Sequence, residues 1–96
     1  RFKELPDYFK SIEEQSVLPY EIILVDGAPI EEIRSENLIK EYIKSSALNI
    51  KYFRYSGGTA IQRNFGIDKA QGDVILFMDD DVRIEPNFIL ELYAIL

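Results

Sequence analysis

The sequence predicts an α/β fold in which a mostly parallel sheet carries helices on both faces. Segments with helical spacing of apolar residues alternate with short apolar runs along the chain. Two of these runs, 22–25 and 74–78, are continuously apolar, as expected for parallel strands that are covered on both faces. This alternation of helices with buried strands is typical of an α/β sheet.

The first half of the chain is expected to contain a helix, a strand and a second helix. Apolar residues at steps of three and four predict a first helix that ends near Ser16: Phe2, Leu5, Phe9 and Ile12. The block 21–26 reads Glu-Ile-Ile-Leu-Val-Asp and predicts a central parallel strand, which Gly27 and Pro29 end. A second amphipathic helix is expected over about 35–46.

The second half is expected to add two strands and two helices. Aromatic and β-branched residues predict a strand over 49–55, nearer to an edge of the sheet. Thr59 is the expected cap of a third helix, in which Gly66 costs about 1 kcal/mol and permits close packing. The strand predicted at 74–78 leads into a run of three aspartates, and a last helix is expected to begin at Pro86.

Composition limits the chain to one compact unit. No linker, low-complexity tract or internal repeat divides the 96 residues, so we expect residues 1–96 to form one partial domain. The absence of cysteine excludes a disulfide framework and a thiolate zinc site. A net charge of −6 with dispersed Lys and Arg argues against a nucleic-acid partner. No stretch approaches the roughly 20 apolar residues of a membrane span.

Polar residues that directly follow predicted strands are the candidates for a functional site, because ligands of open parallel sheets bind outside the carboxyl ends of the strands. Asp26 follows the run 22–25, and the aspartates 79–81 follow the run 74–78. The loop 56–60 follows another strand and should reach the same edge, since right-handed crossovers bring parallel strand ends together. We therefore expect these three segments to converge on one crevice.

The run Asp79-Asp80-Asp81 has two explanations. Adjacent carboxylates repel one another, and a divalent cation would offset their charge. Because alternate side chains of an extended turn point the same way, Asp79 and Asp81 can face one site while Asp80 faces elsewhere. Oxygen ligands without His or Cys favour magnesium or manganese over zinc. The other explanation is a solvated acidic turn before the last helix, where negative charge is mildly favourable. The run by itself leaves both open.

Four ordered segments resemble the nucleotide-binding half of family-two glycosyltransferases with the GT-A fold. They are 21–26 (Glu-Ile-Ile-Leu-Val-Asp), 63–67 (Arg-Asn-Phe-Gly-Ile), 70–75 (Ala-Gln-Gly-Asp-Val-Ile) and 77–82 (Phe-Met-Asp-Asp-Asp-Val). The resemblance covers most of the chain and implies a Rossmann-like half that binds a nucleotide sugar. It also implies that the family's first strand precedes Arg1, and that the acceptor-binding half, with the catalytic general base, lies beyond Leu96.

The resemblance implies a role for each matched polar residue. Asp26 matches the strand-end aspartate that accepts a hydrogen bond from the nucleotide base, usually uracil. Arg63 belongs to the Arg-Asn-x-Gly motif and is expected near the nucleotide. Asp79 matches the first position of the D-x-D motif, which faces ribose or metal, and Asp80 is its middle position in the nucleotide-sugar site. Asp81 matches the position that coordinates Mn²⁺ or Mg²⁺ on the diphosphate.

The implied activity is transfer of a sugar from a nucleotide-diphosphate sugar, most often a UDP-sugar, to an acceptor hydroxyl with inversion. The chain itself is expected to bind rather than to catalyse. A non-catalytic α/β module that binds nucleotide or metal stays open as an alternative. A phosphatase-like hydrolase, with Asp79 attacking phosphorus, is disfavoured because Val82-Arg83 rather than Gly-Thr follow the D-x-D motif. We expect a cytoplasmic protein, and association of the full-length protein with the inner face of the membrane stays open.

Overall fold

The computed structural model describes residues 5–27, 33–78 and 83–96. The chain consists of two compact units. One unit is Tyr20–Ile75, and the other combines residues 1–19 with residues 76–96. In the part of the chain that the structure describes, no helix is long and apolar enough to cross a membrane.

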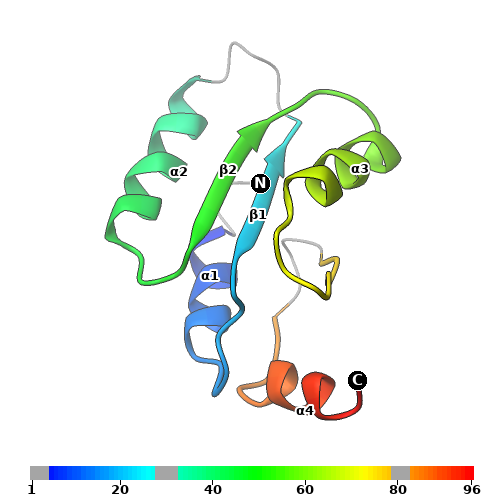
Figure 1. Ribbon diagram of the computed structural model, residues 1–96. Coiled ribbons are helices and arrows are strands. Elements are labelled where there is room, and N and C mark those ends of the chain that lie inside the picture. The colour runs from blue at the N-terminus through cyan, green and yellow to red at the C-terminus, as the bar shows by residue number, and fades with distance from the viewer. Residues whose placement is uncertain (1–4, 28–32, 79–82) are drawn as a thin grey trace. The chain divides into compact units, whose positions relative to one another are not determined.

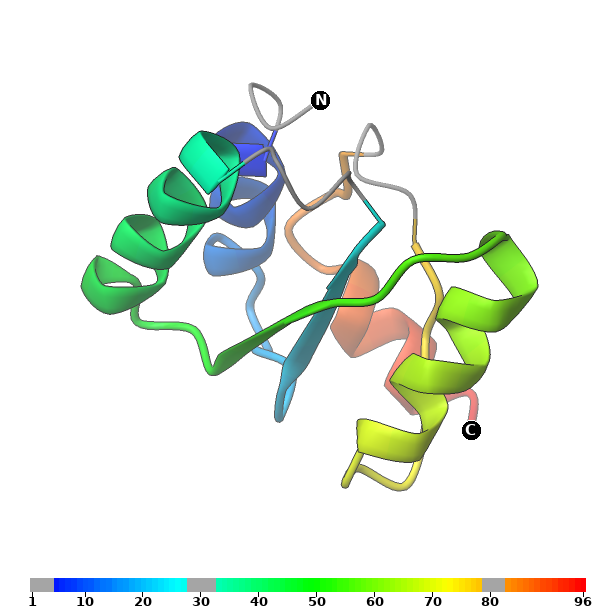
Figure 2. The ribbon, with the colours of Figure 1, turned by 90° about the horizontal axis from the view of Figure 1, so that it is seen from above.

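The unit Tyr20–Ile75 is built on a pair of parallel strands. Strand β1 (Ile22–Asp26) pairs with strand β2 (Ile50–Arg54), so that Ile22 lies opposite Ile50 and Asp26 lies opposite Arg54. Helix α2 (Ile33–Ser45) connects the two strands, and helix α3 (Thr59–Lys69) follows β2. Figures 1 and 2 show the strands between α2 and α3. The continuous apolar run of the sequence thus forms a parallel strand, as predicted.

The contacts of two successive strand residues show that α2 and α3 cover opposite faces of the sheet. On one face, Phe65 of α3 packs edge-on against Phe53, with ring centroids 5.5 Å apart. On the other face, the Arg54 guanidinium lies 3.3 Å from Oε1 of Glu36 on α2. Successive strand residues point to opposite faces, so neighbours 53 and 54 must contact different layers. The predicted α/β arrangement with helices on both faces is therefore confirmed.

The predicted strand over 74–78 is absent from the structure, and this prediction was wrong. In the described part of the unit Tyr20–Ile75, β1 pairs only with β2. Four apolar side chains of the segment are between 42% and 60% exposed: Val74, Ile75, Leu76 and Phe77. A strand covered on both faces needs hydrogen-bonded neighbours and a packed layer on each side. An apolar composition favours burial of such a segment, but it does not specify a partner strand to which the segment could hydrogen-bond.

Two helix starts also differ from the expected ones. Helix α3 has Gly58 at its N-cap, with extended backbone and no side-chain cap, so Thr59 is the first helical residue rather than the cap. Gly57 precedes it with φ of +140°, a backbone conformation that favours glycine. Helix α4 (Phe88–Ala94) has Asn87 at its N-cap, so Pro86 lies before the helix instead of opening it.

In the other unit, the buried side chain of Gln15 links the end of helix α1 (Leu5–Glu13) to the segment before helix α4. Helix α1 buries one apolar side, which consists of Leu5, Tyr8, Phe9 and Ile12. Just after α1, Nε2 of Gln15 donates to the carbonyl oxygen of Glu85 at 2.6 Å, and its Oε1 accepts from the amide of Ile89 at 3.0 Å. The amide of Ser16 also donates to the carbonyl oxygen of Pro86 at 2.8 Å. These bonds fix the end of α1 to the start of α4.

The contact between α3 and β1 gives a stability prediction at Gly66. A Cβ added there would lie 3.7 Å from Cγ2 of Val25, an ordinary van der Waals distance. We expect Gly66→Ala to raise the free energy of unfolding by about 0.5–1 kcal/mol, because alanine has the higher helix propensity. Denaturant unfolding measures this change, and a decrease for Gly66→Ala would contradict the packing described here.

Gly57→Ala is the control, because we expect it to change the free energy of unfolding in the opposite direction. Its φ is positive, and an added Cβ would lie 2.9 Å from Cγ2 of Ile61, so we expect this variant to be less stable.

Candidate functional site

Two charged residues lie at the carboxyl ends of β1 and β2, and the sequence predicted this position for one of them, Asp26. Asp26 ends β1 and Arg54 ends β2, and the two are partners in the strand register. The amide of Tyr55 donates to the carbonyl oxygen of Asp26 at 3.0 Å, which extends the pairing by one residue. From Tyr55 the chain passes through residues 56–58 directly into α3. The end of β1 and the start of α3 therefore belong to the same edge of the sheet.

Asp26 is a buried carboxylate with a tyrosine partner. Asp26 is 8% exposed, and the hydroxyl of Tyr52 donates to its Oδ2 at 2.6 Å. Burial raises the pKa of Tyr52, and the hydrogen bond to Asp26 and its negative charge raise it further. Tyr52 is thus a protonated donor at neutral pH. Sequence reasoning missed this residue, since Tyr52 reads as one more apolar side chain of a strand.

An ion-pair chain lies beside this pair on the α2 side of the sheet. The Arg54 guanidinium lies 3.3 Å from Oε1 of Glu36, and Nζ of Lys40 lies 3.3 Å from Oε2 of the same carboxylate. The side chains of Arg54 and Glu36 are 17% and 22% exposed. Arg54 has no role predicted from the sequence, because it lies inside the strand predicted over 49–55 rather than after it.

The start of α3 lies against the end of β1. The Gln62 side chain leaves no space for a Cβ on Gly27, and its Nε2 donates to the carbonyl oxygen of Tyr55 at 3.4 Å. Arg63 follows Gln62 on α3 and is exposed. The structure therefore brings Asp26 and the α3 segment that carries Arg63 to one edge. The roles expected for these two residues remain predictions.

The three aspartates of the predicted metal site, Asp79, Asp80 and Asp81, lie outside the described residues. Among the residues that the structure does describe, no group of three or more acidic side chains is placed to hold a metal ion. The predicted metal site accordingly depends on the segment 79–82, which the described ranges leave out.

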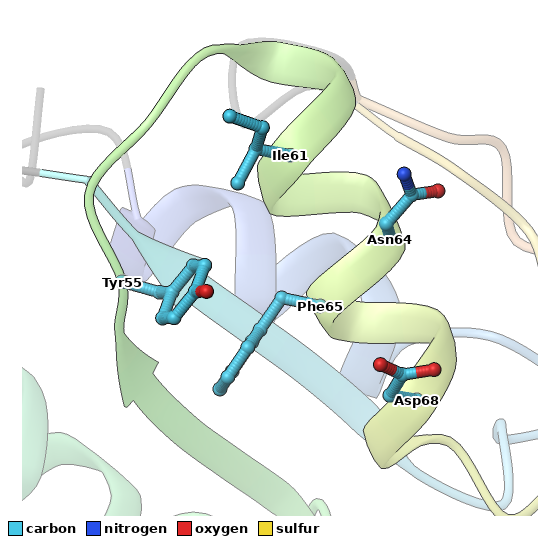
Figure 3. Close-up of a pocket in the computed structure, with 5 residues that line it drawn as sticks. All are labelled: Tyr55, Ile61, Asn64, Phe65 and Asp68. Carbon is cyan, nitrogen blue, oxygen red and sulfur yellow. The ribbon is translucent and has the colours of Figure 1, made fainter.

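A shallow pocket beside α3 is too small to be the nucleotide site. It is lined by Tyr55, Ile61, Asn64, Phe65 and Asp68, and its volume is about 190 Å³ (Figure 3). The rings of Tyr55 and Phe65 stack in it with centroids 4.2 Å apart. Sites for drug-sized ligands measure roughly 300–1,000 Å³. The stacked rings mainly attach the end of β2 to α3.

A second well-bonded carboxylate lies at the opposite, amino-terminal end of β1. Nζ of Lys51 lies 2.8 Å from Oε1 of Glu21, and the backbone amides of Gln71 and Gly72 donate to its Oε2 at 2.5 and 3.0 Å. The Glu21 side chain is 7% exposed. The hydrogen bond from Lys51, followed by that from Gln71, lowers the pKa of Glu21. Glu21 attaches the turn after α3 to the start of β1, a structural role that sequence reasoning missed.

Comparison with known proteins gives a family match over the whole chain. The model of glycosyl transferase family 2 matches residues 1–96. An uncharacterized protein of Haemophilus influenzae is 32% identical over 87 residues, which cover 88% of this chain and 46% of the relative. The uncharacterized glycosyltransferase YwdF of Bacillus subtilis is 32% identical over 89 residues, which cover 93% of this chain and 32% of the relative.

A third relative is named provisionally as a teichuronic acid biosynthesis glycosyltransferase, TuaG of Bacillus subtilis. It is 28% identical over 78 residues, which cover 80% of this chain and 30% of the relative. The chain thus spans less than half of the length of each of these relatives. No solved structure matches the chain.

The bonds of Glu21 give a prediction for stability against pH. A carboxyl whose pKa is lowered in the folded state stabilises the fold above its ordinary pKa of 4.5, and the stabilisation is lost as the pH falls through the lowered value. We expect Glu21→Gln to lower the melting temperature at neutral pH, and the difference from wild type to shrink in acid. Thermal unfolding at both pH values measures this. Glu41→Gln is the control, because Glu41 is 74% exposed. Equal effects of the two variants would contradict the assigned role.

The hydrogen bond of Tyr52 gives a second pH prediction. A raised pKa means that the neutral hydroxyl stabilises the fold below the ordinary pKa of 10.0, and that this contribution is lost as the pH rises above it. We expect Tyr52 to ionise at higher pH than an exposed tyrosine. Tyrosinate absorbance of wild type and Tyr52→Phe measures this. The difference between the two titrations is the absorbance change of Tyr52, and we expect it at the alkaline end of the pH range. A difference centred near pH 10 would contradict the pairing with Asp26.

Proposed function

The chain belongs to glycosyl transferase family 2, and from this premise we propose that it provides the nucleotide-sugar-binding part of an enzyme. The enzyme transfers a sugar from a nucleotide-diphosphate sugar to an acceptor hydroxyl, with inversion at the anomeric carbon. The observation that carries the proposal is the family match over the whole chain. Two relatives with glycosyltransferase names support it.

The proposed donor site lies at the carboxyl ends of β1 and β2. Open parallel sheets bind their ligands there, and the buried Asp26 carboxylate at this edge supports the assignment. In the proposal Asp26 accepts a hydrogen bond from the nucleotide base, and Arg63 on α3 lies near the nucleotide. The proposed donor is a uridine diphosphate sugar, as the resemblance to the family implies; uracil offers a ring N–H to a carboxylate, but so do thymine and guanine, and thymidine or guanosine diphosphate donors stay open.

The proposed metal site consists of Asp79 and Asp81, with Asp80 contributing to the nucleotide-sugar site. Their carboxylates are hard oxygen ligands, and the chain has neither His nor Cys, so the donor set suits Mn²⁺ or Mg²⁺. When bound, such an ion stabilises the charge that develops on the leaving diphosphate. The task of the aspartates is to hold it against the phosphates. None of the described acids is assigned as the general base.

The acidic net charge of −6 supports the absence of a nucleic-acid partner. We propose a cytoplasmic location, and association of the full-length protein with the inner face of the membrane stays open.

Calorimetric titration of UDP with Mn²⁺ into the full-length protein tests this function. We expect metal-dependent binding that Asp81→Ala weakens on the order of tenfold or more, which corresponds to about 1.4 kcal/mol, because the variant removes a metal ligand. Asp68→Ala removes a carboxylate that is exposed on α3, and should bind like wild type.

Two outcomes would count against the proposal. Binding that is absent, or independent of metal, with uridine, guanosine and thymidine diphosphates contradicts the donor site. Tight binding without transfer from any sugar nucleotide instead favours a non-catalytic binding module.

A further inference from the structure

The hydroxyl of Tyr52 is held against Asp26 by the strand register. Tyr52 lies opposite Leu24, and Asp26 lies opposite Arg54, so Tyr52 and Asp26 are diagonal neighbours on one face of the sheet. Residues at every second position of a strand point to the same face, so the Tyr52 ring and the Asp26 carboxylate share a face. The resulting bond of 2.6 Å from the Tyr52 hydroxyl to Oδ2 is short, as expected for a neutral donor on a charged acceptor.

This bond restricts the orientation of the Asp26 carboxylate. The last side-chain torsion of an aspartate is broad, so an unrestrained carboxylate samples many orientations. A donor on Oδ2 favours those in which this oxygen faces Tyr52, and it thereby limits where the other acceptor positions of the group point. An ionised carboxylate accepts at about four positions, so a donor at one of them does not exclude a ligand at another. Because burial raises the pKa of Tyr52, the hydroxyl keeps its proton over the physiological range.

We infer that Tyr52 is a positioning and specificity-determining residue of the donor site, which orients Asp26 to accept from a base that carries a ring N–H. The inference rests on the proposed function, in which Asp26 contacts the nucleotide base. Uracil presents a ring N–H at the position where cytosine presents a bare ring nitrogen. An oriented carboxylate accepts from the first and meets the lone pair of the second. Tyr52 therefore increases the preference for uridine over cytidine nucleotides.

A purely structural Tyr52 predicts a different result. If its hydroxyl only satisfied a buried carboxylate, its removal would destabilise the fold by the cost of a lost hydrogen bond and would weaken both nucleotides equally. The ratio of the two affinities separates the explanations, because any loss of folded protein affects both titrations to the same extent. This ratio is the quantity to measure.

The experiment compares wild type, Tyr52→Phe and Tyr20→Phe in the full-length protein. Each is titrated with UDP and with CDP in the presence of Mn²⁺. Tyr20→Phe is the matched control, because it also removes one tyrosine hydroxyl but from a residue that is 69% exposed and precedes β1. We expect wild type to prefer UDP, and Tyr52→Phe to reduce this preference about tenfold, a change of about 1.4 kcal/mol. Tyr20→Phe should keep the wild-type preference.

The outcomes separate the role of Tyr52 from the proposed function. A preference that falls in Tyr52→Phe and persists in Tyr20→Phe supports the inference. Wild type that binds UDP and CDP equally, or an unchanged preference in Tyr52→Phe, overturns it while the proposed donor site stands. Wild type that binds no nucleoside diphosphate with metal overturns the proposed function, and the role of Tyr52 falls with it.

Discussion

The parallel pairing of β1 with β2 is the constraint on which the unit Tyr20–Ile75 depends. Its register sets Asp26 opposite Arg54, and so places Tyr52 on the face where it reaches the Asp26 carboxylate. A slip of one residue would turn every side chain of a strand to the other face. Tyr52 would then face α3 and Phe53 would face α2. The packing of Phe53 on Phe65 therefore fixes the polar arrangement on the opposite side of the sheet.

The two ends of β1 show how similar carboxylates take different tasks. A buried charge is tolerated when hydrogen bonds satisfy it. Both oxygens of Glu21 are engaged within its own unit: Oε1 by the Lys51 ammonium, and Oε2 by the backbone amides of Gln71 and Gly72. Asp26 lies instead at the edge where parallel sheets bind ligands, beside a loop and the first turn of a helix. Position along the strand, more than residue type, separates a structural carboxylate from a candidate binding group.

Local sequence pattern predicted most elements but not their long-range partners. Periodicity located α1, α2 and α3, and the apolar and aromatic runs located β1 and β2, because these signals depend on neighbouring residues. The same signal failed at 74–78, where a strand would need a partner that composition cannot identify. Tyr52 and Glu21 were missed for a related reason, since their bonds join residues 26 and 50 positions apart. Asp26 lies at the end of β1 as expected, its role in a donor site stays a prediction, and the aspartates 79–81 lie outside the described residues.

The buried amide of Gln15 has a consequence for mutational tolerance. One side chain donates to the carbonyl oxygen of Glu85 and accepts from the amide of Ile89. Glutamate at this position has the same length but no donor at neutral pH, asparagine is one methylene shorter, and an aliphatic residue of similar volume leaves both backbone groups unsatisfied. Few replacements carry a donor and an acceptor at this reach. We therefore expect substitutions at position 15 to be tolerated less well than those at the apolar positions of α1, where volume can be exchanged between neighbours.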